Sequence, residues 1–284
     1  MPTGIWKTSR RSLDCSNKTL VMAILNVTPD SFSDGGKFVS PDTALKQTER
    51  FISEGADIID IGGESTRPGS KRVSVNEEIA RVIPTIEAIT KRFVTPISMD
   101  TTKSEVAKAA VEAGAEIIND ISGLRFDAAI AEVAAKYRTG LVLMHSRGEF
   151  ETMHSQSPVE NVLNVVADDF RRAVGTAQQY GVNLENIALD IGIGFGKTFE
   201  QNLELLAKLD KLVIEFKQYP MLVGTSRKSF IGKILGGVPP GERLSGSLSS
   251  IAIAVWNGAR IVRVHDVKDT VDAIKVIGAL GSTL

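Results

Sequence analysis

The sequence lacks several features that would assign it at once to a class of protein. A single cysteine, Cys15, excludes an intrachain disulfide. Basic residues are not in excess, since the formal net charge is −1, and this argues against a nucleic-acid-binding protein. Apolar runs reach only about six residues, far short of the roughly 20 that a membrane-spanning helix requires. Residues 1–14 contain no apolar segment typical of a secretory signal, so we expect a cytoplasmic protein without membrane or nucleic-acid partners.

What the sequence does contain is a series of short apolar runs separated by segments with helical periodicity. The runs span residues 20–25, 58–61, 96–99, 117–118, 141–144, 187–189, 221–223 and 261–264. This alternation predicts an α/β fold, a single-domain (β/α)8 TIM barrel over residues 20–280 that follows an N-terminal extension, residues 1–19. In such barrels the chemistry lies at the C-terminal ends of the strands, so the residues that end each run are the candidates for function.

Most of these runs end on side chains of the kinds that bind ligands or take part in catalysis. The candidates are Asn26, Asp100, Asn119, Asp190, Lys228, Arg263 and His265. A single aspartate at a strand end could equally be a helix N-cap. Several such groups on different strands indicate a ligand, because isolated buried charges are costly without a partner.

Two long segments carry the most specific motifs. Residues 25–36 have the sequence LNVTPDSFSDGG, and residues 60–69 have the sequence DIGGESTRPG. Shorter matching stretches are residues 99–103, 119–121, 194–198, 226–230 and 263–266. Together they resemble the dihydropteroate synthase family from about residue 20 to residue 276. Members of that family join 6-hydroxymethyl-7,8-dihydropterin diphosphate to 4-aminobenzoate, forming 7,8-dihydropteroate and releasing diphosphate.

The resemblance implies roles for the polar residues of the strand ends. Asp190 would hold the pyrimidine edge of the pterin, because a carboxylate suits the N–C–N donor edge of that ring. Asp100, Asn119 and Lys228 would make the other pterin contacts. The reaction resembles a dissociative substitution, in which Asp100 would stabilise the pterin cation at the exocyclic carbon.

The diphosphate leaving group requires positive charge and hydrogen-bond donors. Arg263 and His265, on the last predicted strand, are expected to supply them, since barrels often bind phosphate near strands seven and eight. The family also uses Mg²⁺, and the resemblance implies that Asn26 contacts it. One neutral protein ligand is consistent with an ion that keeps most of its waters.

The resemblance places the second substrate, 4-aminobenzoate, among residues of the long loops and of the sixth and seventh strand ends. These residues are Thr66, Arg67, Pro68, Phe195, Lys228 and Ser229, with Phe32 and Asp34 from the first loop. The loops 27–40 and 65–75 are expected to close and exclude water. The family also implies a homodimer.

Three other functions stay open at this point. A related pterin-binding methyltransferase domain, which acts with methyltetrahydrofolate and a corrinoid protein, would share the aspartate and asparagine contacts. A pterin-binding protein without activity and a Schiff-base aldolase that uses Lys228 are weaker alternatives. The chain departs from the family at Ile191, where proline is usual, and proline there should slightly raise stability or pterin affinity. His145 has no predicted role beyond packing.

Overall fold

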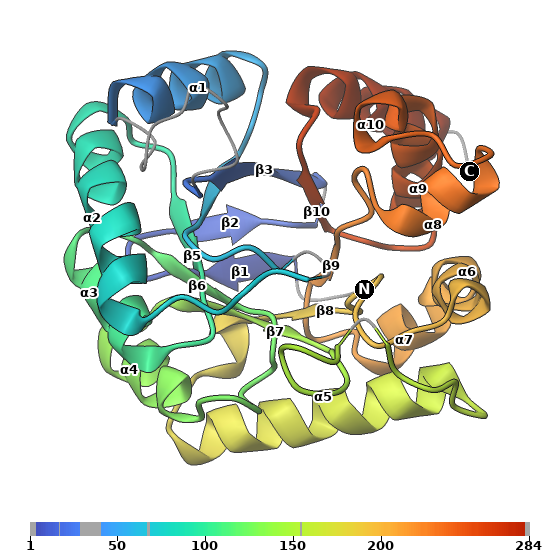
Figure 1. Cartoon of the computed structure of the whole chain (residues 1–284), viewed down its shortest axis with the longest axis horizontal. Helices are drawn as coiled ribbons and strands as arrows, with labels where there is room; N and C mark the ends of the chain where they lie inside the picture. The colour runs from blue at the N-terminus through green and yellow to red at the C-terminus, as the bar shows by residue number, and fades with distance from the viewer. Residues whose placement is uncertain (1–3, 17, 29–40, 67–68, 154, 282–284) are drawn as a thin grey trace.

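A computed structural model of the chain describes residues 4–16, 18–28, 41–66, 69–153 and 155–281. Eight parallel strands close into a barrel in the order β10-β3-β4-β5-β6-β7-β8-β9, and helices surround it (Figure 1). The strands are β3 (Leu20–Asn26), β4 (Ile58–Gly62), β5 (Ile97–Asp100), β6 (Ile117–Asp120), β7 (Gly140–Met144), β8 (Ile187–Asp190), β9 (Met221–Val223) and β10 (Ile261–Val264). The predicted single-domain TIM barrel is confirmed.

The helices follow the strands in the alternation that the sequence predicts. They are α1 (Pro41–Ser53), α2 (Val75–Arg92), α3 (Ser104–Glu112), α4 (Ala129–Tyr137), α5 (Val162–Gln179), α6 (Phe199–Ala207), α7 (Leu209–Glu215), α8 (Ser229–Ile234), α9 (Leu244–Trp256) and α10 (Val267–Gly281). In α2 the Ser74 side chain caps the first turn by accepting the Glu77 N–H, and Val82, Ile86 and Ile89 form its buried stripe. None of the described helices is long and apolar enough to cross a membrane.

Strand residues alternate between the barrel interior and the layer under the helices. In β4, Ile59 and Ile61 belong to a core cluster with Val82 of α2. Ile58 belongs instead to a second cluster that fills the lower interior, and Asp60, two residues on, faces the same way. The interior is therefore apolar near the strand starts and polar near the strand ends.

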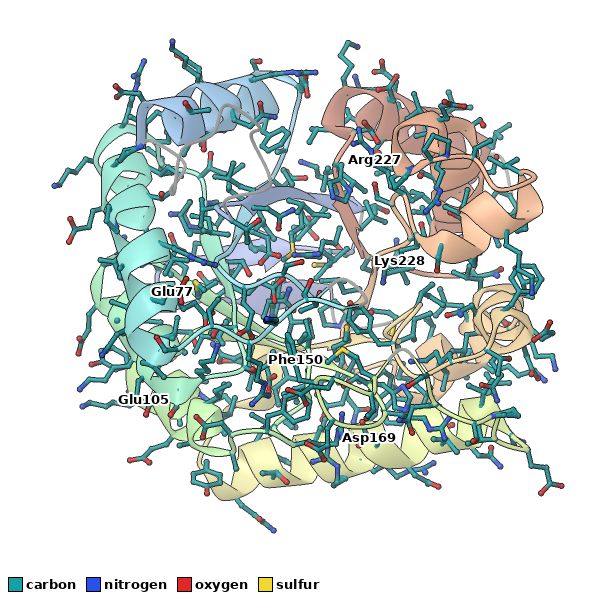
Figure 2. All side chains as sticks on the ribbon, viewed as in Figure 1. Glu77, Glu105, Phe150, Asp169, Arg227 and Lys228 are labelled. Atoms are coloured by element: carbon teal, nitrogen blue, oxygen red, sulfur yellow. The ribbon has the colours of Figure 1, made fainter. Side chains whose placement is uncertain are left out.

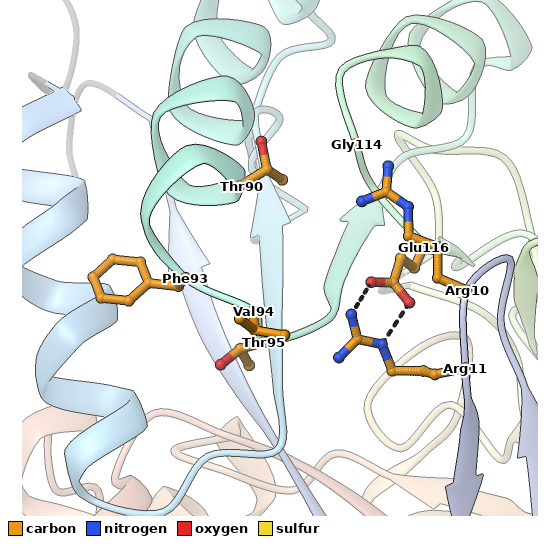
Figure 3. A pocket seen from close by; sticks show the side chains of 8 residues that line it. All are labelled: Arg10, Arg11, Thr90, Phe93, Val94, Thr95, Gly114 and Glu116. Atoms are coloured by element: carbon orange, nitrogen blue, oxygen red, sulfur yellow. Dashed lines mark hydrogen bonds and ion pairs between the residues drawn. The ribbon is translucent and has the colours of Figure 1, made fainter.

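A two-stranded hairpin closes the barrel at the starts of its strands. Its strands are β1 (Ile5–Lys7) and β2 (Ser12–Asp14). The fully buried Trp6 packs among the first residues of several barrel strands and donates its indole N–H to the Asn186 carbonyl at 2.8 Å. Arg11 forks onto Glu116 at 2.6 and 2.9 Å beside a small pocket (Figure 3). Because this end is plugged, a ligand must enter from the opposite mouth.

Cys15 packs in the same lower cluster. Burial raises the pKa of its thiol to about 12, so it stays protonated and unreactive. A buried thiol of this kind acts as a small apolar side chain in the core.

Candidate active site

Four residues at the ends of neighbouring strands lie in one row across the open mouth. Asn26 pairs with Gly62, Gly62 with Asp100, and Asp100 with Asn119. A Cβ at Gly62 would lie 3.5 Å from Asn26 Oδ1 and 3.7 Å from Asp100 Oδ2, so both oxygens border the space that the glycine leaves open. The barrel thus brings three predicted site residues together.

The strongest electrostatic feature of the mouth is Arg263, whose guanidinium bridges two carboxylates. Its Nε donates to Asp60 Oδ2 at 2.6 Å, and its Nη2 donates to Asp100 Oδ2 at 2.7 Å. Asp60 is not among the site residues predicted from the sequence. The signal for it was a charged residue inside an otherwise apolar strand, which is costly unless it is paired.

This bridge changes the interpretation of Arg263. We expected a cation that is available to diphosphate, but its charge is already balanced by two carboxylates. With both carboxylates ionised, Asp60, Asp100 and Arg263 carry a net charge of −1. Such a cluster favours a cation above it more than an anion.

Asp100 sits in an unusual environment for a carboxylate. Burial raises its pKa to about 7, Arg263 opposes that rise, and Asp60 and Glu78 add to it. An acid with such a pKa exchanges protons near neutrality. This is typical of functional sites, although paired structural carboxylates also show it.

Asn119 and Asp60 each leave one buried oxygen without a partner among the described residues. Asn119 donates its amide to Asp60 Oδ2 at 3.3 Å, while Asn119 Oδ1 and Asp60 Oδ1 accept no hydrogen bond. Buried acceptors are nearly always satisfied in folded proteins. Two open acceptors side by side therefore indicate a ligand that carries N–H groups.

Asp190 ends β8 and is almost fully buried. Its Oδ1 accepts the Gly192 N–H at 2.7 Å. Burial raises the pKa of this carboxyl, and the charges of Lys228 and Lys197 oppose the rise. The carboxylate is thus oriented by its own loop and supported by two ammonium groups.

Lys228 lies on the segment that joins β9 to α8 (Figure 2). Its ammonium donates to the Ile193 carbonyl and lies 4.7 Å from the centre of the Phe195 ring. Burial lowers its pKa to about 8, and Asp190 and Asp100 oppose that fall. Lys228 and Phe195 therefore form one wall of the mouth, while the neighbouring Ser229 is exposed.

His265 is held by Ser226, another residue that the sequence analysis did not assign. Ser226 Oγ accepts the His265 backbone N–H at 3.2 Å and lies 3.0 Å from the ring Nδ1. A hydroxyl that accepts the backbone N–H is free to donate to Nδ1, which favours a proton on Nε2. The adjacent Arg227 points elsewhere, onto Asp266 at 3.0 Å.

The remaining predicted residues fall into two groups. Thr66 is half-buried on the segment between β4 and α2, and His145 is buried, with no partner for its Nδ1 in the part of the chain that the structure describes. Arg67 and Pro68, like Phe32 and Asp34 of the first loop, lie outside the described residues. Within the described ranges, no group of three or more His, Cys, Asp or Glu side chains could hold a metal ion.

The barrel and its polar mouth define a pterin-binding enzyme, and residues 22–265 match the family described as pterin binding enzyme. The chain is 48% identical over 267 residues to the dihydropteroate synthase of Synechocystis sp., covering 94% of this chain and 92% of the relative. It is 47% identical over 278 residues to that of Bacillus subtilis, covering 98% and 94%.

Solved structures agree with these relatives. The Yersinia pestis dihydropteroate synthase in a sulfonamide complex superposes with a TM-score of 0.91 at 42% identity, covering 98% of this chain and 99% of that one. The Xanthomonas albilineans enzyme with 4-aminobenzoic acid gives 0.90 at 39% identity, covering 98% of both chains. The chain therefore belongs to the dihydropteroate synthase family, and the methyltransferase alternative is not favoured.

Proposed function

We propose that the chain condenses 6-hydroxymethyl-7,8-dihydropterin diphosphate with 4-aminobenzoate to give 7,8-dihydropteroate and diphosphate. The observation that carries the proposal is the set of buried acceptors and ammonium groups that meet at one mouth. A pterin offers N–H donors along its pyrimidine edge and acceptors elsewhere on the ring. The mouth offers the complementary groups in a barrel closed at its other end.

Asp190 is the group best suited to the pyrimidine edge. A carboxylate can accept two parallel N–H bonds, and that pairing is strong in a site shielded from water. Asn119 would accept a further ring N–H through its open Oδ1. Lys228 would donate to a ring acceptor, and this requires its ammonium to turn from the Ile193 carbonyl.

The bond that breaks joins the exocyclic carbon to a diphosphate oxygen, and its electron pair leaves with the diphosphate. The pterin cation that forms would face the carboxylates of Asp60 and Asp100. The amine of 4-aminobenzoate then attacks the carbon and loses a proton. Fixed charges around the cation lower the barrier because they need no rearrangement as charge develops.

Diphosphate is an anion, whereas the cluster of Asp60, Asp100 and Arg263 has no net positive charge. His265 would donate from Nε2, and Arg263 still has N–H groups that neither carboxylate uses. Mg²⁺ would fit here because the oxygens of Asn26 and Asp100 border the open space above Gly62, and Mg²⁺ prefers oxygen ligands and keeps several waters. When bound, the ion would neutralise charge on the leaving diphosphate.

The second substrate would lie between the Lys228–Phe195 wall and Thr66, near Ser229. The other two expected contacts, Arg67 and Pro68, lie outside the described residues. The Xanthomonas albilineans relative was solved with 4-aminobenzoic acid and the Yersinia pestis relative with a sulfonamide drug. By the same likeness we propose that sulfonamides compete with 4-aminobenzoate on this chain.

A homodimer is the proposed assembly. Large apolar side chains are exposed on α9 and α10. They are Ile253, Trp256, Val276 and Leu280. Such a surface is costly on a monomer and is typical of contacts between copies. The proposed location, the cytoplasm, rests on the sequence features alone.

The first test is diphosphate release that depends on both 4-aminobenzoate and the pterin diphosphate. We expect release only with both substrates present. A folded chain that releases none would overturn the proposal. Asp190→Asn removes the charge at constant shape, so pterin affinity should fall by about a hundredfold while the melting temperature stays close to that of the parent chain. Near-normal turnover in this variant would refute the role of Asp190.

A further inference from the structure

Lys197 lies beside the candidate site, and none of the proposed chemistry uses it. Its ammonium donates to the Gly192 carbonyl at 2.7 Å, the Phe195 carbonyl at 2.9 Å and the His145 carbonyl at 3.3 Å. An ammonium has three N–H groups, so all three donate to backbone oxygens. The side chain therefore acts as a clamp on main chain from two neighbouring βα segments.

The two clamped segments are in tight contact. Gly192 has φ 63°, and a Cβ there would lie 1.9 Å from the His145 carbonyl oxygen. Gly196 has φ 70°, and a Cβ there would lie 2.4 Å from Arg147 Cβ. Arg147 also donates to the Gly196 carbonyl at 3.0 Å. The segment after β8 is thus pressed against the segment after β7, with Lys197 at the contact.

Two groups of the candidate active site depend on this clamped segment. Asp190 is oriented by the Gly192 N–H, and the Gly192 carbonyl is one of the oxygens that Lys197 binds. Phe195 presents its ring to Lys228, and its carbonyl is another. Lys197 therefore fixes the main chain that orients Asp190 and the main chain that carries Phe195.

The clamp is also a charge next to Asp190. The groups that face Asp190 are the ammonium groups of Lys228 and Lys197, the guanidinium of Arg263 and the Gly192 N–H, and all four favour the ionised carboxylate. Burial lowers the pKa of Lys197 well below its usual value, Lys228 and Arg147 add to that fall, and Asp190 and Asp169 oppose it. Removing Lys197 would leave Asp190 easier to protonate.

We propose that Lys197 is a positioning residue for the pterin, which it never touches: it clamps the segment of residues 191–197 so that Asp190 and Phe195 stand at the right separation. This inference rests on the proposed function. It predicts a larger defect for the pterin than for 4-aminobenzoate, because Lys197 holds Asp190 through Gly192 but reaches the 4-aminobenzoate pocket only through Phe195.

The test compares Lys197→Met with Lys208→Met, an exposed lysine of the same region paired with Glu204. We expect Lys197→Met to raise KM for the pterin diphosphate on the order of tenfold, through loss of charged hydrogen bonds. KM for 4-aminobenzoate should rise by a clearly smaller factor, since that pocket is affected only through Phe195. The pH below which pterin affinity falls should be higher in Lys197→Met, since Asp190 must be ionised to accept the ring N–H groups. Lys208→Met should match the parent chain in both KM values and in the pH dependence of pterin binding.

Equilibrium binding of 6-hydroxymethylpterin, measured by calorimetry, provides a readout that does not need turnover. If Lys197→Met does not fold, Lys197→Gln keeps two of the donors and should show the same pattern more weakly. Equal losses for both substrates with an unchanged pH profile would overturn the inference. A parent chain that forms no dihydropteroate would overturn the proposed function instead, while the binding measurement would still test Lys197.

Discussion

Asp60 offers the sharpest test of how the mouth is held together. The substitution Asp60→Asn keeps the shape of the side chain and removes its charge. Asp60 is fully buried, and its partner Arg263 has a side-chain exposure of 22%. Breaking a buried pair by removing one partner costs about 3–5 kcal/mol, because the other charge stays buried and uncompensated. Asp100 still pairs with Arg263 at 2.7 Å, so we expect the lower end, about 3 kcal/mol.

Urea unfolding at neutral pH measures this cost directly, and the slope of the transition should not change. In a thermal scan the same loss should lower Tm by about 6 °C for a domain of this size. Glu185→Gln is the matched control, since its pair with Lys7 has side-chain exposures of 50% and 45%. An exposed pair contributes less than about 1 kcal/mol, so the free energy of unfolding and the Tm of the control should barely change.

The double variant Asp60→Asn with Arg263→Met decides whether the pairing is the cause. If the two side chains act through each other, the combined loss should be smaller than the sum of the single losses by about 1 kcal/mol or more. Additive losses, or an Asp60→Asn variant that unfolds with the parent chain, would refute the reasoning. Either result would mean that the bridge contributes little to the fold.

Three further outcomes are expected. The folded chain holds a proton on Asp100, with its pKa of about 7, where the unfolded chain does not. This stability is complete below about pH 4 and is lost as pH rises through about 7, so Asp100→Asn should flatten the decline of Tm over that range; an unchanged slope would contradict it. Lys103 binds Glu64 at 2.9 Å and the buried Glu78 at 2.5 Å. Lys103→Met should therefore cost about 3 kcal/mol in urea unfolding, and a loss below about 1 kcal/mol would refute this. Ile191 is fully buried in the core, which reverses the expectation from sequence. Ile191→Pro should lower stability by about 1 kcal/mol, because the loss of buried apolar surface outweighs the stabilisation that proline gives by restricting the unfolded chain. A rise in Tm would contradict this.

The location of the site followed from the sequence because the signals are local. Each apolar run is short and bounded, and parallel strands in a closed barrel all end at one mouth. Asn26, Asp100, Asn119, Asp190 and Lys228 could thus be collected without coordinates. The family motifs then supplied the roles that composition and periodicity cannot.

The partners of these residues could not be derived in the same way. Asp60 and Arg263 are 203 residues apart, and nothing in their spacing says that one reaches the other across the barrel. The same is true of Ser226 beneath His265 and of the carbonyl oxygens around Lys197. Main-chain acceptors are invisible in a sequence, because every residue carries one.

The sequence by itself thus determined the barrel and which strand ends carry functional side chains, because both depend on patterns within a few consecutive residues. The closed barrel decided which charges neutralise each other and which acceptors stay open. Those outcomes depend on distances of a few ångströms between distant segments. For that reason Arg263, expected to supply positive charge to diphosphate, is paired with two carboxylates in a cluster without net positive charge, and Lys197 binds main-chain carbonyl groups.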